Sequence, residues 1–163
     1  MERSAGFENP TRDGAENRDR QTGLLLRFLD VAENIEPLHG QKFETVFSDE
    51  EHKREFLNNL TAQEFTELLN GVNGILRAKN KEEWGMDGAG VGVESGLLGT
   101  VYVAPRQEDK PELLVETLSA AKTMNQENRD LKDVALLVAS ALNAIHPFGD
   151  GNGRTSRILY LLL

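Results

Sequence analysis

Residues 146–157 read HPFGDGNGRTSR, and this stretch brings a histidine, a carboxylate, three glycines and two arginines into twelve residues. The segment before it, Val134–Ile145, contains almost no polar side chain, so we expect a helix that is buried on all sides. Pro147 cannot continue that helix. The sequence therefore predicts His146 at the end of a rigid, buried element.

The glycines after His146 predict a backbone cradle for an anion. Gly151 and Gly153 can both adopt positive φ, which lets successive N–H groups converge on one ligand. Helical spacing resumes from about Arg154 to Leu159, and the N-terminus of that helix adds a favourable dipole. Such a density of polar groups directly after an apolar helix indicates a phosphate site.

The side chains of the same stretch suit the transfer of a phosphate-containing group. Histidine is the natural general base near neutral pH, and a carboxylate such as Asp150 is a hard ligand for Mg²⁺. The guanidinium groups of Arg154 and Arg157 match phosphate oxygens. Alone, His146 would be an ordinary histidine at a helix end, and Asp-Gly and Asn-Gly are turn dipeptides. The complete set favours a functional site, and Phe148 is expected to anchor the loop in the core.

Three other ligand-binding patterns are excluded. Residues 150–153 look like the start of an EF-hand loop, but Arg154 stands at an acidic ligand position and Thr155 replaces the required glycine. A P-loop ends in Gly-Lys-Ser/Thr, which this stretch lacks. The glycine cluster at 88–92 fails the GxGxxG spacing of a dinucleotide site.

The stretch matches the pattern HPFx(D/E)GNGRxxR at every defined position, and thereby resembles the signature of the Fic family. The resemblance covers roughly residues 61–163. It implies an all-α helical bundle with a short β-hairpin flap over the active site. It also implies an enzyme that moves the AMP part of ATP onto a hydroxyl side chain of a target protein, with ATP and Mg²⁺ as cofactors.

The resemblance assigns a role to each residue of the stretch. His146 would be the general base for the target hydroxyl, and Asp150 would bind the Mg²⁺ that bridges the α and β phosphates. Arg154 would bind the β phosphate and Arg157 the γ phosphate. The α phosphate would be held by Asn152 and by the backbone of the loop, including Gly149, Gly151 and Gly153.

One segment breaks the helical pattern. Thr100–Val103 alternates polar and apolar residues within a glycine-containing stretch, which predicts a β-strand. In the Fic resemblance this strand belongs to the flap, which aligns the target chain by adding it as a further strand. The flap residues expected to dock the target are Val101, Tyr102 and Val103. An ordinary surface hairpin is the alternative.

The clearest helix start outside the stretch is Thr61, which forms a capping-box pattern with Glu64. An apolar stripe continues from there to Leu76. Gly71 and Gly74 interrupt the stripe, and we expect another helix to approach closely at these positions.

Further helices are expected on both sides. We predict a first helix over 23–34 and a second after Ser48, whose capping-box partner is Glu51. A later helix opens near Pro111 and runs to about residue 124. Asp130 is the predicted N-cap of the helix that ends at His146.

Three segments follow from these signals. Residues 1–22 are rich in charged and small polar side chains and are expected to be disordered. Residues 23–60 are expected to form an N-terminal helical segment, and the resemblance implies that residues 61–163 form a Fic domain. Because the sequence ends within an apolar helix without a capping residue, we expect the last helices of the family to be missing.

The overall composition describes one acidic domain. With 163 residues, 39% hydrophobic residues and a net charge of −9, the chain can bury a single core. The negative charge argues against nucleic acid and anionic membranes as main partners. The sequence has no cysteine, no signal peptide and no apolar run that could span a membrane, so we expect a cytoplasmic protein.

The family also suggests a form of self-restraint. Fic proteins are commonly restrained by an inhibitory helix of pattern (S/T)xxxE(G/N), whose glutamate pairs with the second signature arginine. Residues 4–9 fit the pattern with Glu8, whereas Glu33 lies on a better helix but has Leu29 where Ser or Thr is expected. Glu127 also fits the pattern, at the wrong place in the chain. Glu8 and Glu33 are therefore the candidate inhibitory residues, with solvated surface glutamates as the alternative.

The function predicted from these patterns is transfer of AMP from Mg-ATP to a Ser, Thr or Tyr hydroxyl of a target protein. One alternative is a different transfer, such as the phosphorylation by Doc-type relatives, which carry a lysine where this chain has Gly153. Another is a repressed nucleotide-binding toxin or regulatory module, controlled by an inhibitory helix or a separate antitoxin. The intact His146 speaks against an inactive relative and is compatible with both an active and a repressed enzyme.

Overall fold

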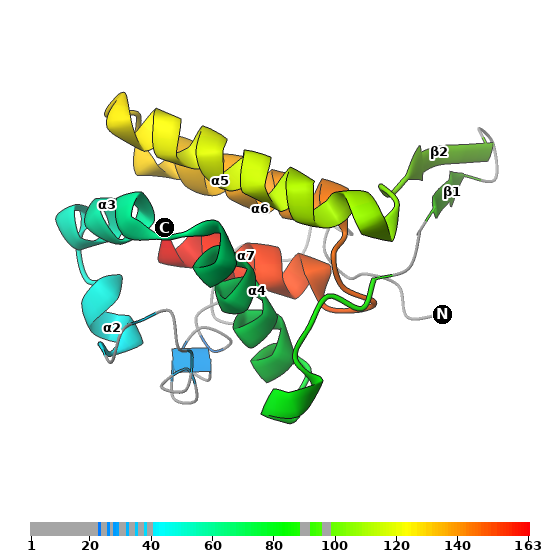
Figure 1. The fold of residues 1–163 in the computed structure, drawn as a ribbon, viewed down its shortest axis with the longest axis horizontal. Helices are drawn as coiled ribbons and strands as arrows, with labels where there is room; N and C mark the ends of the chain where they lie inside the picture. The colour runs from blue at the N-terminus through cyan, green and yellow to red at the C-terminus, as the bar shows by residue number, and fades with distance from the viewer. Residues whose placement is uncertain are drawn as a thin grey trace.

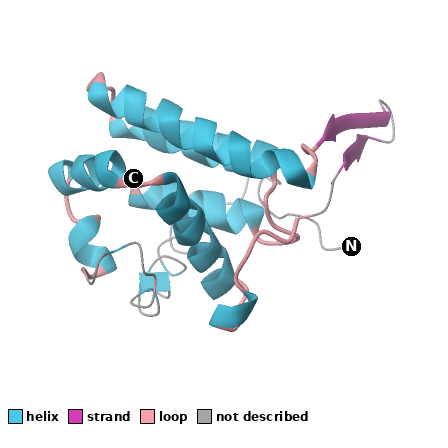
Figure 2. Cartoon of the chain, in the orientation of Figure 1, coloured by secondary structure: helices cyan, strands magenta, loops and turns pink. Residues whose placement is uncertain are grey.

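The structure is a computed structural model, and it describes residues 41–88, 92–95 and 99–163. It also describes single positions nearer the N-terminus: Gly23, Leu26, Phe28, Leu29, Ala32, Ile35 and Leu38. The described body is helical, which confirms the predicted all-α class (Figure 2). The principal elements are α2 (Phe43–Val46), α3 (Glu50–Asn59), α4 (Ala62–Leu76), β1 (Gly92–Ser95), β2 (Gly99–Val103), α5 (Lys110–Gln126), α6 (Leu131–Ile145) and α7 (Asn152–Leu162).

The helices pack around one hydrophobic core. In Figure 1, α5 and α6 lie side by side, and α7 packs against α6 and α4. The loop that contains residues 146–151 joins α6 to α7 at the end of the body where α5 begins. The core therefore holds both helices that flank this loop in fixed positions. The buried residues that these helices contribute include Leu69, Val72, Leu114, Val134, Val138, Leu142 and Ile158.

The start of α4 follows the sequence prediction. The Thr61 side chain accepts a hydrogen bond from the Glu64 N–H at 3.2 Å, and the Glu64 carboxylate accepts one from the Thr61 N–H at 2.8 Å. This reciprocal pair is the predicted capping box.

The glycines of α4 are approached by side chains rather than by the expected helix. A Cβ atom added to Gly71 would lie 3.1 Å from Cγ1 of Ile35, and one added to Gly74 would lie 2.2 Å from Cδ1 of Trp84. Trp84 directly follows a short 3₁₀ turn, Lys81–Glu83, and Ile35 is not helical. The predicted close approach is confirmed, but the neighbour is a side chain and not the expected helix. A glycine in a helix makes room for either, because a bulky side chain also needs the space of the missing Cβ atom.

The predicted start of α3 is wrong by one residue. Its N-cap is Asp49, whose carboxylate accepts a hydrogen bond from the His52 N–H at 2.9 Å. Ser48 donates its hydroxyl to the Thr45 carbonyl instead. The carboxylate replaces the hydroxyl because it is an equally good acceptor and is favoured by the helix dipole.

The helix α6 is amphipathic, which corrects the expectation that it is buried on all sides. Leu131, Val134 and Val138 face the core, whereas Leu136 is 57% exposed. The neighbouring helices cover only one side of α6, so the apolar residues on its other side remain in contact with solvent. The predicted N-cap is confirmed, since Asp130 accepts a hydrogen bond from the Lys132 N–H at 2.9 Å.

The helix α5 and the hairpin were placed well by sequence. The helix begins at Lys110, one residue before Pro111, and ends at Gln126. The strands β1 and β2 pair antiparallel with a register shift between Val93 and Glu94, and β2 contains the predicted strand at 100–103. The hairpin projects from the end of the body beside the start of α5 (Figure 1).

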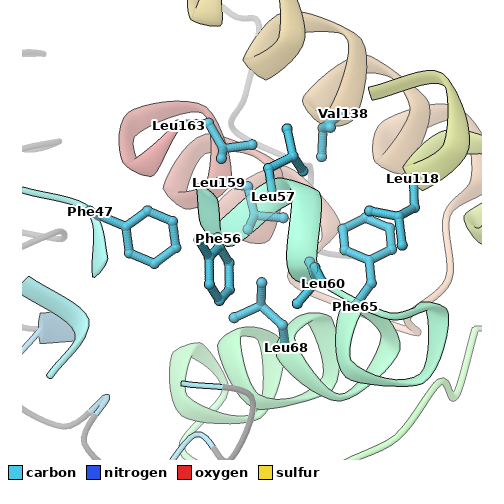
Figure 3. Close-up of a pocket in the computed structure, with 10 residues that line it drawn as sticks. All are labelled: Phe47, Phe56, Leu57, Leu60, Phe65, Leu68, Leu118, Val138, Leu159 and Leu163. Carbon is cyan, nitrogen blue, oxygen red and sulfur yellow. The ribbon is translucent and has the colours of Figure 1, made fainter. Parts of the chain in front are cut away.

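The interior also holds a small apolar cavity. It has a volume of about 10 Å³ and lies among side chains of α3, α4, α5, α6 and α7 (Figure 3). None of the residues at 146–157 lines it. The lining residues are Phe47, Phe56, Leu57, Leu60, Phe65, Leu68, Leu118, Val138, Leu159 and Leu163. A nucleotide cannot occupy so small an apolar space, so the cavity is a packing defect of the core.

The N-terminal predictions are only partly accessible. Residues 1–22 lie outside the described residues, and so does Glu33. Of the helix expected over 23–34, the described positions Gly23, Leu26, Phe28 and Leu29 are α-helical, whereas Ala32 lies in a 3₁₀ turn. The Phe28 ring packs edge-on against Phe43. Among the described residues, none of the helices combines the length and apolar character needed to cross a membrane.

Candidate functional site

The site begins at His146, which is the C-cap of α6 as predicted. Its N–H donates to the Leu142 carbonyl at 2.9 Å, and its backbone adopts a left-handed conformation with φ 53° and ψ 57°. A residue with a Cβ pays a conformational cost there. The reversal ends the helix before Pro147 and turns the chain into the loop.

The environment of His146 favours the neutral imidazole. The side chain is half-buried, and burial lowers the pKa of His146 below its usual value of 6.5. The charge of Lys110 lowers this pKa further, whereas a hydrogen bond with the backbone of Asn143 acts in the opposite direction. A neutral imidazole is the form that accepts a proton.

The loop after His146 is closed by Asn152. The Asn152 side chain accepts a hydrogen bond from the Phe148 N–H at 3.0 Å and donates one to the Phe148 carbonyl at 2.7 Å. Phe148 is buried at 1% exposure, as expected for an anchor. The Asn152 side chain, predicted to hold the α phosphate, is thus engaged within the loop, and its primary effect is to fix the loop's shape.

The helix after the loop begins two residues earlier than predicted. Gly151 has φ 80°, as expected, but Gly153 lies inside the first turn of α7 and has no positive φ. The prediction for Gly153 was wrong because the reversal needs only one residue with positive φ, and Gly151 supplies it. No side chain caps α7. Its first amides, at residues 152–154, therefore carry no hydrogen bond among the described contacts and can bind an anion.

Two other amides of the loop are occupied by carboxylates. The Gly149 N–H donates to Oδ1 of Asp87 at 2.9 Å, and the Gly151 N–H donates to Oδ1 of Asp150 at 2.6 Å. Both amides had been predicted to face a phosphate. In this conformation, acidic side chains take the place of an anionic ligand at these two positions.

The two signature arginines differ in their partners. Arg154 forms an ion pair with Asp150 at 3.0 Å and donates to the Leu76 carbonyl at 3.3 Å. Arg157 is half-buried and has no acidic partner among the described residues. Burial, followed by the charge of Arg154, lowers the pKa of Arg157, yet a guanidinium stays charged near neutral pH. A partly desolvated cation without an acid is well suited to an anionic ligand.

Three residues outside the signature hold the loop, and sequence reasoning missed all of them. Buried Asn73 of α4 donates to the Asp150 carbonyl at 2.9 Å and to Oγ1 of Thr155 at 3.2 Å. Asp87 binds Gly149, and Lys110 donates to the His146 carbonyl at 2.8 Å. Each lies 36 to 82 residues from its partner in the sequence. Nothing in the local sequence around any of them indicates these contacts.

The acidic member of this group is itself held by cations. Asp87 accepts hydrogen bonds from Nη1 of Arg77 at 2.8 Å and from Nζ of Lys79 at 2.8 Å. Burial alone would raise the pKa of Asp87, but the hydrogen bonds from Lys79, Gly149 and Arg77 outweigh it and hold the pKa far below its usual range. Asp87 therefore remains ionised and links the C-terminal end of α4 to the loop.

The predicted flap is attached directly to this site. The Gly88 N–H, at the base of the hairpin, donates to the Pro147 carbonyl at 3.0 Å. Val103 is 69% exposed, while the side chains of Val101 and Tyr102 lie outside the part that the structure describes. The hairpin projects away from the body in Figure 1, so the expected covering of the active site is not seen in this conformation. Glu8 and Glu33 also lie outside the described residues.

The donor set is compatible with Mg²⁺ bound through a substrate. Within the described ranges, no three His, Cys, Asp or Glu side chains form a cluster that could hold a metal by themselves. Asp150 supplies one carboxylate, 57% exposed, at the start of α7. Mg²⁺ is commonly bound by one or two carboxylates together with substrate phosphates, and this site offers that arrangement if Asp150 leaves Arg154.

Comparisons with known proteins agree on the type of chain. The model of the Fic/DOC family matches residues 49–163. No curated protein matches the chain. Among solved structures, it is similar to a Fic family protein from Desulfovibrio desulfuricans G20, with 21% identity and a TM-score of 0.50 over 91% of this chain. The match covers 50% of that protein's chain, so the present chain spans about half of its length.

Proposed function

Because the chain belongs to the Fic/DOC family, whose members transfer nucleotide or phosphate groups, we propose that it transfers the AMP part of Mg-ATP to a protein hydroxyl. The observation that carries the proposal is the combination of an uncapped α7 N-terminus and a half-buried Arg157 that has no acidic partner among the described residues, both in the helix that follows His146. Anion-binding groups and a neutral base thus converge on one loop. This is what attack of a hydroxyl on a phosphate requires.

The reaction forms one bond and breaks another at the α phosphorus. The oxygen of a Ser, Thr or Tyr side chain attacks the α phosphorus while its proton passes to the imidazole of His146. The bond from the α phosphorus to the oxygen that bridges to the β phosphorus breaks, and pyrophosphate leaves. Free amides at residues 152–154 hold the α phosphate, and Arg154 and Arg157 hold the outer phosphates.

Asp150 is the proposed ligand for Mg²⁺. When bound, the ion neutralises charge on the phosphate oxygens. In this structure Asp150 pairs with Arg154 and accepts from the Gly151 N–H. Both groups would be released to the nucleotide when the carboxylate turns to the metal, so nucleotide and metal would bind together.

The identity of the transferred group depends on Gly153. Doc-type relatives carry a lysine at this position, and a Cβ atom here would meet nothing closer than Nη1 of Arg157 at 3.9 Å. The site therefore has room for a side chain. The backbone would therefore accept the lysine of the Doc-type relatives, and the glycine is a difference in chemistry rather than in packing. Gly153 thus supports AMP transfer over phosphorylation.

A repressed nucleotide-binding module is the second candidate. It is favoured by the carboxylates of Asp87 and Asp150, which occupy the Gly149 and Gly151 amides. A separate antitoxin or a segment of this chain would then set the activity. Such a protein would bind Mg-ATP but label no target until the inhibitor is removed.

The test is to incubate the protein with a cell lysate, Mg²⁺ and ATP labelled on either the α or the γ phosphate. We expect a target protein to become labelled from the α phosphate and not from the γ phosphate. Mass spectrometry should then identify AMP on a hydroxyl side chain of that protein. His146→Ala should lower transfer by about 10²- to 10⁴-fold while keeping nucleotide binding, because the imidazole acts on the target's proton. Label from the γ position would identify phosphorylation, and wild-type rates in His146→Ala would exclude the general-base role.

A further inference from the structure

Lys110 is a buried cation that the proposed transfer does not use. Its side chain is 0% exposed, although lysine is almost never fully buried unless it is paired. Among the described residues no carboxylate pairs with it, and burial lowers its pKa. A buried ammonium is costly unless its donors are satisfied, so the acceptors of Lys110 show what it stabilises.

Both acceptors of Lys110 belong to the site. Its Nζ donates to the His146 carbonyl at 2.8 Å and to the Gly88 carbonyl at 3.2 Å. The first carbonyl belongs to the left-handed residue at the end of α6, and the second lies at the base of the hairpin. One side chain at the start of α5 therefore joins the proposed base to the proposed flap.

The backbone around these carbonyls leaves little freedom. A Cβ atom on Gly88 would lie 2.6 Å from the His146 oxygen, and the Gly88 N–H is bonded to the Pro147 carbonyl. The His146 carbonyl is thus enclosed between Gly88 and the Lys110 ammonium. Since the left-handed conformation of His146 is unfavourable by itself, these contacts stabilise the backbone that aims the imidazole.

We propose that Lys110 is a positioning residue for His146: its ammonium group fixes the left-handed backbone of the base and fastens the hairpin to it. The role rests on the proposed function of His146 as general base. The charge of Lys110 adds a second effect, because it supports the neutral imidazole that burial already favours. Among the described residues, Lys110 is the charged side chain that shifts the pKa of His146, so its effect on that pKa can be isolated.

The experiment compares Lys110→Met, Lys110→Gln and Lys110→Arg in the complete chain. Methionine keeps the length without charge or donor, glutamine keeps a donor, and arginine keeps the charge. Lys122→Met is the matched control, since Lys122 lies about three turns further along α5. For each variant, kcat, KM for ATP and the pH dependence of kcat are measured, and the imidazole of His146 is titrated by NMR.

We expect Lys110→Met to lower kcat by about 10²-fold, the scale of a small misplacement of a catalytic group. KM for ATP should change little. The acid limb of the pH profile and the His146 titration should move to higher pH in the Met and Gln variants and stay in place in Lys110→Arg and Lys122→Met. A residue that only stabilises the fold would lower the melting temperature without moving the titration.

Three results would overturn the proposal. They are a folded Lys110→Met protein with wild-type kcat, a titration of His146 that does not move in it, or an equal effect of Lys122→Met. If Lys110→Met does not melt cooperatively, the proposal is judged from kcat and the His146 titration of Lys110→Gln and Lys110→Arg. The NMR titration needs no turnover, so a wild-type protein that transfers no AMP would reject the proposed function while still deciding the role of Lys110.

Discussion

At the residue scale, the Asp150 carboxylate can either keep its contacts within the protein or bind a metal, but not both. Its carboxylate accepts from the Gly151 N–H at 2.6 Å and pairs with Arg154 at 3.0 Å. The same oxygens are the only acidic ligands that the loop offers to a metal. In this structure Asp150 engages two of the anion-binding groups, the Gly151 N–H and the Arg154 guanidinium. With Mg-ATP it would exchange these contacts for the metal.

We therefore predict that Asp150→Ala raises the Mg²⁺ concentration needed for half-maximal transfer and weakens ATP in the productive pose. Asp150→Asn is the matched variant, because its amide oxygen can still accept from the Gly151 N–H while the charge is lost. Both variants should show the raised Mg²⁺ requirement in a metal titration of the transfer rate. An unchanged titration curve would make Asp150 a turn residue only.

At the scale of elements, Asp87 links the segment that follows α4 to the loop. Arg77 and Lys79 follow α4, Gly88 begins the path to the hairpin, and Gly149 belongs to the loop. Three donors converge on one carboxylate. The relative placement of these segments therefore depends on the charge of Asp87, which lies outside the signature and outside the helices α6 and α7 that flank it.

Asp87→Asn should destabilise the fold at neutral pH, because it leaves two cations without their acid. For a carboxylate that is 40% exposed, solvent screening limits the cost to about 1 kcal/mol, or about 2 to 4 °C in Tm. The pKa of Asp87 is depressed in the folded state, so its contribution is complete above the unfolded pKa of about 3.9 and is lost as the pH falls below it.

Thermal melts from pH 8 to pH 3 check this prediction. The gap in Tm between wild type and Asp87→Asn should be constant above about pH 4 and narrow below it. Glu116→Gln, at an exposed position of α5, is the control and should give no such gap. A gap that is equal at all pH values would show that the contribution of Asp87 does not depend on its charge.

On the scale of the whole molecule, Arg157 marks the place where a restraint would act. The described residues supply no acid to it, and the two candidate glutamates, Glu8 and Glu33, lie outside them. Glu127 is the C-cap of α5, at the opposite end from Lys110 and about 25 Å away along the helix. The structure thus places Glu127 away from the site, as the sequence indicated.

We predict that Glu8→Gly or Glu33→Gly, in the complete chain, increases transfer and improves ATP binding, because the freed Arg157 can then bind the γ phosphate. Arg157→Ala should not reproduce this gain, since it removes the phosphate contact as well, at a cost of about 1.5 to 3 kcal/mol. Glu127→Gly is the control without effect. Self-labelling and target-labelling assays measure all four variants, and activation by neither candidate would exclude both as inhibitory residues.

The sequence by itself determined the features that depend on neighbours within a few residues. The capping box of Thr61 and Glu64, the cap at Asp130, the strand at 100–103 and the positive φ of Gly151 were all predicted from local patterns. Each rests on hydrogen bonds or backbone preferences within about one turn. The signature loop was found in the same way, because its chemistry is contiguous.

Only the tertiary structure decided which distant residues hold that loop. Asn73, Asp87 and Lys110 reach it across 77, 62 and 36 residues, and in sequence they look like ordinary polar residues of helices and turns. Their roles depend on how α4 and α5 pack on the loop, as does the exposure of Leu136 on a helix with an almost wholly apolar sequence. Burial is a property of the packed elements, so a local pattern cannot fix which polar groups meet inside.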